Sequence, residues 1–588
     1  MLNLKTPGVY IQEISTLPAS VAPVATAIPA FVGYTQKREL NGEILDDYYP
    51  VRITSMLEYE EVFGLAFDEN YNVKLEDDGD NVKISFDASY KASDYILYYA
   101  MDMYFSNGGG PCYVISAGLY DYDTPNISNT NLQSGINEIM QEDEPTLIVV
   151  PEIAKLNTTG QRKALNDSIL TQCNTLQDRF GILDVKVDHT KTVKADGDFF
   201  RNEVGSDNLK YGAAYYPSLH TILPKYYEQR SVNIVDARSI PVYDNESLDV
   251  VQYGTGSDAS KASATITFNS RFKGLLNHTI TIGDEAFIFK ATGSATEIEI
   301  GETAAETAAN FAAFVNDSNN KSAVPEKAVT VSLDGTTATI TADAEGVDGN
   351  DILIEYTGTS GIRVSGKSLE GGSKEDMSPD LALYNQIKTF LDTNLVTLPA
   401  SSAVAGVFAR VDRDRGVWKA PANVSINKVS NPSVLVSAEE QGSLNIDANT
   451  GKSINVIRNF QGRGVLIWGS RTLAGNDNEW RYVPVRRLFI FIEESIKKAT
   501  EPTVFEPNDA NTWAKLKSMI ENFLTSLWRE GALAGAAPQD AFFVKIGLGE
   551  TMSSLDILEG RLNVEIGIAA VRPAEFIVLK FSHKLQES

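Results

Sequence analysis

The alternation of apolar and polar positions is most informative between Asn459 and Glu494. A glycine-rich turn at residues 461–464 precedes a short, β-branched apolar run, Val465 to Trp468, which predicts a buried strand. After a polar loop, apolar residues recur at helical spacing and predict an amphipathic helix; they are Leu488, Phe489, Ile492 and Ile496. The predicted strand and helix form a corner around which the other elements are placed.

Arginines gather beside large aromatic residues in this corner. Such a combination is typical of a surface that contacts another protein. An ordinary corner whose arginines pair with nearby acids is equally compatible with the pattern. The candidate interface residues are Arg463, Arg471, Trp480, Arg481, Arg486 and Arg487, together with Trp418 from the preceding segment. Upstream, the alternating charges of Asp412 to Arg415 indicate a solvated or interface ion-pair cluster rather than chemistry.

The first 250 residues alternate between predicted strands and helices. A helix with Ser93 as N-cap is expected to run to Ser106 and to stop at the glycines of residues 107–111. A strand–helix–strand unit with short loops predicts a parallel pair joined by a right-handed crossover. The expected strands are Ala30–Tyr34, Cys112–Ala117, Thr146–Val150 and Phe180–Val185, with a helix at Gly160–Leu176 and an extended run at Lys210–Leu219.

The composition changes at Tyr253, and residues up to Ser373 are rich in Thr, Ala, Gly and Ser. Short alternating runs separated by turn residues predict strands; they are Ala264–Phe268, Thr279–Ile282, Ala286–Phe289, Val329–Leu333 and Ala338–Thr341. Asp334-Gly335 predicts a hairpin, and a capping box at Thr303–Glu306 predicts one helix. Glycine-rich joints at 254–257 and 371–373 indicate an inserted domain that faces outward.

Besides the elements of the Asn459–Glu494 corner, further helices and strands are predicted after the insert. One helix is expected to begin at Ser378-Pro379 and to bury Leu383, Ile387 and Leu391. A second helix, Trp513 to Arg529, carries a buried apolar stripe and ends at a glycine. Strands follow at Ala541–Ile546 and Glu559–Ile568.

The last strand has apolar residues on both faces. Phe576, Val578 and Lys580 alternate along it with Ile577, Leu579 and Phe581. As a free terminus it would be an exposed, aggregation-prone edge. It is therefore expected to pair, either within its own sheet or with a neighbour's sheet by strand augmentation.

The first 30 residues are predicted to be extended. Prolines at positions 18, 23 and 29 exclude a helix, and Val9, Ile11 and Ile14 can line one face of a strand. This segment is either a loose terminus or an arm that pairs with another chain.

Composition restricts the function classes further. A length of 588 residues implies several domains, and 43% hydrophobic residues with a mean hydropathy of −0.16 indicate a soluble globular protein. No apolar run is long enough to span a bilayer, and no signal peptide is recognisable, so folding in a cytoplasm is expected. A net charge of −27 argues against a nucleic-acid-binding surface.

Enzyme chemistry is not indicated by the residues that could carry it. Glu152 and Asp184 stand near strand ends, where α/β enzymes place active sites, but no nucleophile, glycine fingerprint or histidine accompanies them. The string Thr450–Ser453 resembles the end of a P-loop, but Ile446 occupies the position of the required glycine. A strand is predicted at Ile454–Val456, where the P-loop needs a helix.

Metal and cofactor sites are not expected either. The two cysteines, Cys112 and Cys173, are interpreted as reduced and structural. Asp348, Asn350 and Asp351 suggest calcium, but their spacing departs from the EF-hand and Ile352 sits at a ligand position. The histidines are not at ligand spacing; they are His189, His220, His278 and His583.

Strings throughout the chain resemble the contractile tail sheath proteins of myophages, R-type pyocins and phage-like contractile injection systems. The Asn459–Glu494 corner resembles that family's C-terminal core signature. Six further matches lie in the expected order: TPGVY followed by Glu13, YFSNGG before CYVI, LIVVPE, FGILD, AAYYP and RGVWKAPAN. Near the C-terminus, RPAEFI resembles the family's terminal arm. In the insert, the ETAANF helix resembles a domain that recurs in phage tail proteins.

This resemblance implies a mixed α/β (α+β), multidomain fold with a discontinuous core. The expected parts are residues 1–29 as an N-terminal arm, 30–110 as the N-terminal part of the core, 111–252 as an α/β domain, 253–375 as the inserted β-rich domain, 376–568 as the C-terminal core domain and 569–588 as a strand arm. In the family, the arms reach neighbouring subunits. The expected arm residues are Pro7, Gly8, Val9, Tyr10 and Ile11, and Pro573, Phe576, Ile577, Val578 and Leu579.

The function implied is a structural subunit that polymerises around an inner tube and contracts without nucleotide hydrolysis. Expected partners are further copies or paralogous sheath subunits, the inner tube protein, and baseplate and terminator proteins, with no cofactor, nucleic acid or membrane insertion. Synthesis is expected in a bacterial cytoplasm, for a virion tail or an injection particle that is released or retained. Two alternatives are a non-contractile tube or shell protein and a surface adhesin that uses the 253–375 insert.

Overall fold

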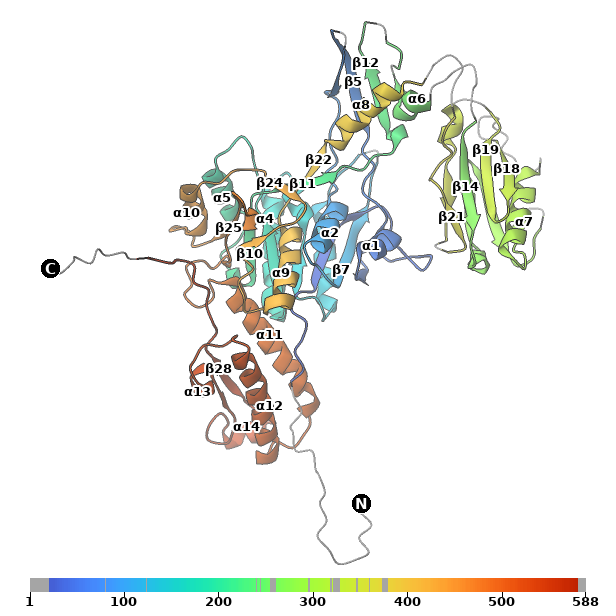
Figure 1. Ribbon diagram of the computed structural model, residues 1–588. Coiled ribbons are helices and arrows are strands. Elements are labelled where there is room, and N and C mark those ends of the chain that lie inside the picture. The colour runs from blue at the N-terminus through green and yellow to red at the C-terminus, as the bar shows by residue number, and fades with distance from the viewer. Residues whose placement is uncertain are drawn as a thin grey trace, which may run out of the picture.

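The computed structural model has four hydrophobic cores (Figure 1). It describes residues 21–579 except 80, 123, 240, 244, 254–260, 295–296, 318–319, 321–327, 345–346, 359 and 373–378. The largest core belongs to a central body, and the others to an upper extension, the insert and a C-terminal lobe. Residues 376–568 contribute to three of these four cores, so the cores do not follow the segment boundaries expected from the sequence.

The central body is built on a nine-stranded sheet of order β23-β26-β25-β10-β9-β8-β1-β7-β4. Its central strands are parallel, and β4, β23 and β26 pair antiparallel at the two sides. The strands are β1 Pro29–Thr35, β4 Pro50–Ile53, β7 Cys112–Leu119, β8 Leu147–Val149, β9 Phe180–Asp184, β10 Gly212–Tyr216, β23 Val424–Ser425, β25 Ile454–Phe460 and β26 Gly464–Ile467. The predicted parallel pair β8–β9 and the strand beginning at residue 465 are confirmed.

Helices cover this sheet, as continuous apolar runs in parallel strands require. Helix α2 (Leu97–Ser106) packs against α9 (Ser401–Arg415), while α3 (Asn129–Glu138) packs against α4 (Thr159–Leu176). Smaller elements complete the body: β2 Glu39–Leu40, β3 Glu43–Ile44, α1 Met56–Phe63, η1 Ile139–Gln141, η2 Pro151–Lys155, α5 Val193–Asn202, η3 Leu209–Tyr211, β11 Leu219–Pro224, β22 Leu395–Leu398, β24 Val429–Pro432 and α10 Ala438–Asn445.

The upper extension joins segments that are distant in sequence. Its four-stranded sheet, of order β13-β12-β5-β6, packs against two helices (Figure 1). The elements are β5 Tyr71–Asp78, β6 Asn81–Phe86, η4 Gln229–Ser231, β12 Val232–Asp236, β13 Glu246–Ser247, α6 Leu248–Tyr253 and α8 Leu381–Asp392. The chain enters and leaves the insert from this extension, through α6 and α8.

The insert is a two-sheet sandwich with one helix, set apart from the body in Figure 1. Its sheets have the orders β18-β19-β14-β21 and β17-β16-β15-β20. Its elements are β14 Ser263–Phe268, η5 Phe272–Leu275, β15 Thr279–Ile282, β16 Glu285–Lys290, β17 Glu297–Glu299, α7 Ala304–Asn316, β18 Val329–Asp334, β19 Thr337–Ala342, η7 Val347–Asp351, β20 Ile354–Tyr356 and β21 Ile362–Val364. The predicted hairpin and the helix start at Thr303 are confirmed.

The C-terminal lobe, residues 483–570, lies below the body in Figure 1. Two long helices, α11 (Val483–Thr500) and α12 (Ala510–Arg529), pack against a two-stranded sheet of β27 (Phe542–Lys545) and β28 (Glu565–Ile568). Short helices complete it: η8 Glu501–Thr503, α13 Pro538–Ala541 and α14 Ser554–Leu558. Residues 21–28 connect this lobe to the body, because Val21 packs in the lobe core and Ile28 donates a 3.0 Å hydrogen bond to Thr146 Oγ1.

Three predicted helix starts and one strand start are wrong. Helix α12 begins at Ala510 rather than at Trp513, because Asp509 caps it, and the strand predicted from Glu559 begins at Glu565. Helix α2 begins at Leu97 rather than after Ser93, because the Glu152 carboxylate accepts the backbone N–H groups of Ile96 and Leu97 and caps the helix from a distant segment. Helix α8 begins after Asp380, whose side chain accepts the N–H of Leu383. The expected cap, Ser378, lies outside the described residues.

Candidate assembly interface

The C-terminal segment, residues 571–579, is the most exposed apolar part of the described chain. It forms no helix or strand, and it runs away from the body (Figure 1). Phe576, Ile577, Val578 and Leu579 are 68%, 79%, 77% and 71% exposed, respectively. Four consecutive large apolar residues in water are unfavourable in an isolated chain, because burying each one is worth about 1.5–3 kcal/mol. The segment therefore has the character of an unpaired docking strand.

One carboxylate fixes this segment to the body. Glu575 forms a bidentate ion pair with Arg471, with distances of 2.6 Å and 2.9 Å, and accepts hydrogen bonds from Tyr482 and Asn445. Burial raises the pKa of Glu575, but the hydrogen bonds from Arg471 and Asn445 outweigh it and leave the pKa below its usual value. Since residues 576–579 come directly after this anchor, their point of departure from the body is fixed.

Strand β28 of the C-terminal lobe has an open edge. Within the described residues its sheet contains only β27 and β28, so β28 has one strand neighbour. In an antiparallel pair, every second residue turns its backbone N–H and C=O away from that neighbour. This edge can therefore accept another strand.

An apolar groove of about 630 Å³ lies beside this edge. One wall is α11, through Phe489, Ile492 and Ile496, and the floor includes Leu516 and Ile520 of α12. The other wall is formed by alternate residues of β28 and of the segment that leads into it: Leu562, Val564, Ile566 and Ile568. A strand added beside β28 would lie over α11, and its inward side chains would fill the groove.

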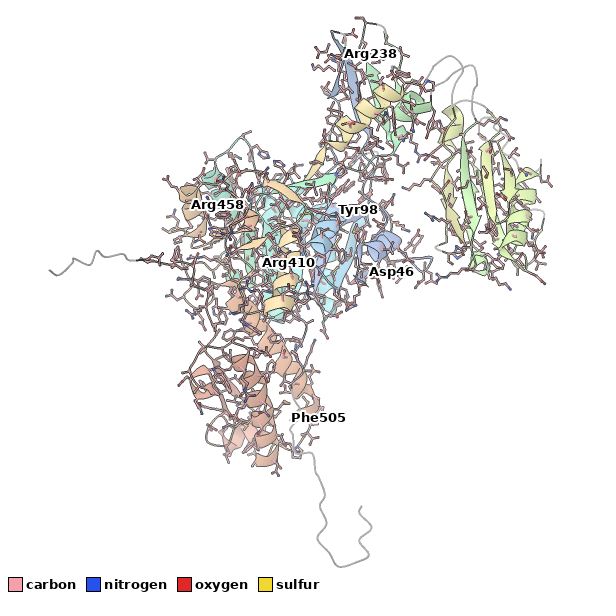
Figure 2. All side chains as sticks on the ribbon, viewed as in Figure 1. Asp46, Tyr98, Arg238, Arg410, Arg458 and Phe505 are labelled. Carbon is pink, nitrogen blue, oxygen red and sulfur yellow. The ribbon has the colours of Figure 1, made fainter. Side chains whose placement is uncertain are left out.

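Phe505 stands at the rim of this groove, on the outer side of the lobe (Figure 2). Its side chain is fully exposed, at 103% of the reference value. Its φ of +72° lies in the left-handed region, which is a genuine outlier for a bulky residue. No sequence motif marks Phe505; the available signal is a Val-Phe pair in the polar stretch between Pro502 and Pro507.

The arginines of the predicted interface are mostly used within the chain. Arg487 is 3% exposed, forms a bidentate ion pair with Asp412 of α9 (2.5 Å and 2.9 Å), and donates to the carbonyl of Thr26. Arg471 is likewise 3% exposed and holds Glu575. These contacts connect α11, α9 and residues 21–28. They correspond to the second interpretation of the sequence, in which the arginines pair with nearby acids.

Arg486 is also internal, because its guanidinium lies 4.8 Å from the ring of Tyr211 and 4.7 Å from that of Trp480. Three other candidates are more accessible. Arg463 is exposed beside Phe460, and Arg481 is half-buried and bonds to Asn478. Trp418 packs half-buried against the core of the C-terminal lobe. Contact with a second chain stays a prediction for Arg463, Arg481 and the accessible edges of the two tryptophans.

The N-terminal arm residues Pro7, Gly8, Val9, Tyr10 and Ile11 lie outside the described residues. The described chain begins at Val21, in the core of the C-terminal lobe. Val24 then donates a 3.2 Å hydrogen bond to Ser495 of α11. The described chain therefore begins in the lobe that also carries the groove.

The two acids at strand ends have structural roles. Glu152 accepts hydrogen bonds from the backbone of Tyr34, Ile96 and Leu97, and Asp184 accepts one of 2.8 Å from the backbone of Ser401 at the start of α9. Burial raises the pKa of Glu152 to about 8 and that of Asp184 to about 7. Each carboxyl thus holds the N-terminus of a helix that covers the sheet.

The P-loop-like string has no phosphate-binding geometry. Lys452 is buried, and its ammonium donates to the carbonyls of Arg201 and Val204, at 2.7 Å and 2.6 Å, at the end of α5. The residues that follow form strand β25, as predicted, where a P-loop requires a helix.

The sequence that suggested a calcium site, residues 348–351, also has a structural role at Asn350. Asn350 is buried, and its side-chain amide forms two hydrogen bonds with the backbone of Gly372. Within the described ranges, no group of three or more His, Cys, Asp or Glu residues could hold a metal ion. The helices described include none with both the length and the apolarity needed to cross a membrane.

Two strand edges in the insert, those of β18 and β17, bond to a helix, in contrast to the edge of β28. Asn316 of α7 donates to the carbonyl of Val331 in edge strand β18 and accepts its N–H, both at 2.8 Å. Asn310 of the same helix donates to the carbonyl of Glu299 in edge strand β17. Helix α7 therefore occupies hydrogen-bonding positions on edges of both sheets.

Comparison with known proteins places two family domains on the chain. Residues 298–473 match the phage tail sheath protein central domain, and residues 475–584 match the phage tail sheath C-terminal domain. A tail sheath protein of Burkholderia phage BcepMu is 30% identical over 159 residues, which are 26% of this chain and 33% of that protein. The alignment with a second curated tail sheath protein covers 19% of its length, so the matches span a minor part of these relatives.

Solved structures resemble the whole chain. The helical sheath of the anti-feeding prophage in its contracted state is 25% identical, with a TM-score of 0.51, over 99% of this chain and 100% of that one. A chain of the anti-feeding prophage baseplate is 26% identical, with a TM-score of 0.50, over 99% and 100%. The mixed α/β fold expected from the sequence is confirmed.

Proposed function

We propose that this chain, whose central and C-terminal parts belong to the phage tail sheath family, is a structural subunit of a contractile sheath. The observation that carries the proposal is the pairing of an exposed apolar segment with an open strand edge and groove in the same molecule. A single chain leaves both unsatisfied, whereas a lattice of identical chains satisfies both. The likeness to helical sheath structures supports such a lattice.

Residues 573–579 of one subunit would join the lobe of a neighbour by strand augmentation. The segment would add beside β28, and alternate side chains, either Phe576 and Val578 or Ile577 and Leu579, would enter the groove. About four backbone hydrogen bonds at ~1 kcal/mol each, together with two buried apolar side chains, would make one joint worth several kcal/mol. The N-terminal arm, with Pro7 to Ile11, would form a second joint of the same kind.

Contraction in this proposal uses no nucleotide. Body, insert and lobe have separate hydrophobic cores and can move as rigid units, while residues 21–28 and 571–575 act as hinges. The energy would come from a metastable extended lattice that rearranges to bury more surface between the cores. The structural roles of Lys452, Glu152 and Asp184 support a non-enzymatic protein.

The partners follow from this role. The chain would bind further copies of itself or paralogous sheath subunits, an inner tube protein, a baseplate and a terminator, without nucleic acid or membrane insertion. It would be made in a bacterial cytoplasm and become part of a tail or an injection particle. An adhesin that uses the insert has less support, because the exposed apolar segment and the open edge of β28 both lie outside the insert.

Electron microscopy of the purified full chain tests the proposal. We expect striated cylinders in a long and a short form. Cylinders of a single length would indicate a rigid tube, and clean monomers at high concentration would contradict the proposal.

A further inference from the structure

Phe505 lies in the loop between α11 and α12, at the mouth of the groove beside β28. Among the described residues with positive φ that are not glycine, most are asparagines, which tolerate this conformation. A phenylalanine does not, so the loop holds Phe505 against an unfavourable backbone energy.

Hydrogen bonds fix this loop on both sides of the residue. Val504 donates to the carbonyl of Glu501 at 3.1 Å, and Glu506 donates to that of Thr503 at 3.0 Å. Asn508 accepts a 2.7 Å bond from the Trp513 indole and donates a 3.0 Å bond to the carbonyl of Arg561. The loop is thereby joined both to α12 and to the segment that leads into β28.

In the isolated chain, the strained backbone of Phe505 and its fully exposed aromatic ring are both energetically unfavourable. Hydrogen bonds hold the loop in place, so flexibility of the loop does not explain the strained backbone or the exposed ring. They are accounted for when a binding partner covers the ring, because rigid aromatic anchors lose little entropy on binding. Phe505 lines the groove and is also exposed to solvent.

We propose that Phe505 is a latch, meaning a fixed aromatic side chain that covers the C-terminal segment of a second copy of this chain once that segment has added to β28. The inference rests on the proposed function, since it requires the strand joint. The occupant follows from what the molecule leaves uncovered, namely the apolar residues 576–579. These residues run away from their own lobe (Figure 1), so the joint is made between copies.

The proposed role of Phe505 also implies which strands the groove would bind preferentially. An added strand that lies over α11 would present one row of side chains to the groove and its outer row near the rim. Phe505 would contact the outer row, so both rows of an apolar strand would be buried. The segment Phe576–Leu579 supplies apolar residues in both rows, whereas a strand with polar residues in its outer row would gain nothing from Phe505.

The test measures binding of a fluorescent peptide with the sequence of residues 571–588 to the full chain, held below its self-association concentration. We expect Phe505→Ala to weaken binding roughly tenfold, as for an interface anchor. Leu558→Ala is the matched control, because Leu558 is 83% exposed on the same lobe but does not line the groove. It should bind the peptide as the unmodified chain does.

Phe505→Gly separates the latch from general damage to the lobe. Glycine relieves the strained φ, so this variant should unfold at a higher temperature than the unmodified chain and still bind the peptide weakly. Equal binding by the unmodified chain and both Phe505 variants would overturn the latch and leave the strand joint intact. Absence of peptide binding to the unmodified chain would overturn the joint and the latch together.

Discussion

The insert and the C-terminal lobe both combine helices with small, mostly antiparallel sheets, but they treat their strand edges in opposite ways. In the insert, α7 places Asn310 and Asn316 on the outer strands of both sheets. In the lobe, the two-stranded sheet keeps an open edge at β28 beside an empty apolar groove. A two-stranded sheet is marginal by itself, whereas a sandwich with its own core is complete.

This difference indicates which part of the chain requires a second copy to complete its strand pairing. The insert can be attached or removed without changing the pairing requirements of the rest. The lobe and the segment that follows it form two halves of a joint, and neither half is satisfied within one chain. The incomplete region, rather than the larger decoration, therefore determines assembly.

Among the changes that test this comparison, removal of residues 571–588 should have the largest effect on assembly. The truncated chain should stay folded, because the described part of the segment, residues 571–579, contributes no residue to the four cores, but it should form no cylinders in electron micrographs. The control is replacement of residues 254–378 by a short Gly-Ser linker, which should leave cylinder formation intact. Normal cylinders from the truncated chain would contradict the account.

Loss of the anchor should weaken assembly without abolishing it. Glu575→Ala leaves Arg471, which is 3% exposed, without its carboxylate, and such a loss costs about 2–3 kcal/mol. The concentration needed to form cylinders should rise accordingly in sedimentation assays. Glu559→Ala removes an exposed ion pair with Arg561 and should change little, because exposed pairs are worth about 0–1 kcal/mol. Equal effects of the two substitutions would argue against anchoring by Glu575.

Acid should release the segment in a reversible way. Hydrogen bonds from Arg471 and Asn445 outweigh burial and hold the pKa of Glu575 below its usual value. The stabilisation is therefore complete above the unfolded pKa of about 4.3 and is lost as the pH falls through the lower folded value. A fluorophore on the segment should report release below about pH 4, and Glu575→Gln should remove that pH dependence.

Exposing the edge of strand β18 should have a smaller effect, chiefly on the stability of the insert. Asn316→Ala removes two hydrogen bonds to Val331, which should cost the insert about 1–3 kcal/mol and speed amide exchange in β18. The exposed edge should also make the chain prone to unspecific association. Asn310→Ala removes one bond and is the milder reference; indistinguishable behaviour of Asn316→Ala and the unmodified chain would show that the edge needs no block.

Much of the fold could be predicted from periodicity. Five strands of the insert, helix α7 and the strand–helix corner at residues 465–500 follow from patterns of period two and 3.6, whereas the three-residue strands β17, β20 and β21 were not predicted. Helix α9 was missed, because residues 401–408 are apolar or small on every side and are buried throughout. Such a run does not distinguish a buried helix from a strand.

Long-range contacts explain the remaining differences. Nothing local to Ser93 reveals that Glu152, far along the chain, caps α2 instead. The apolar character of residues 576–579 was recognised in the sequence, which predicted a strand that pairs in its own sheet or in a neighbour's; in the single chain these residues are exposed and form no strand. The groove was not, because its walls come from α11, α12 and the strand after residue 561, and only packing brings them together.

Amide hydrogen exchange, compared between the dispersed and the assembled full chain, tests the central claim most directly. The account predicts that exchange slows on assembly at both halves of the joint, residues 565–568 and 575–579, while β18 of the insert exchanges at the same rate in both states. Unchanged exchange along residues 565–568 and 575–579 in assembled cylinders would contradict it.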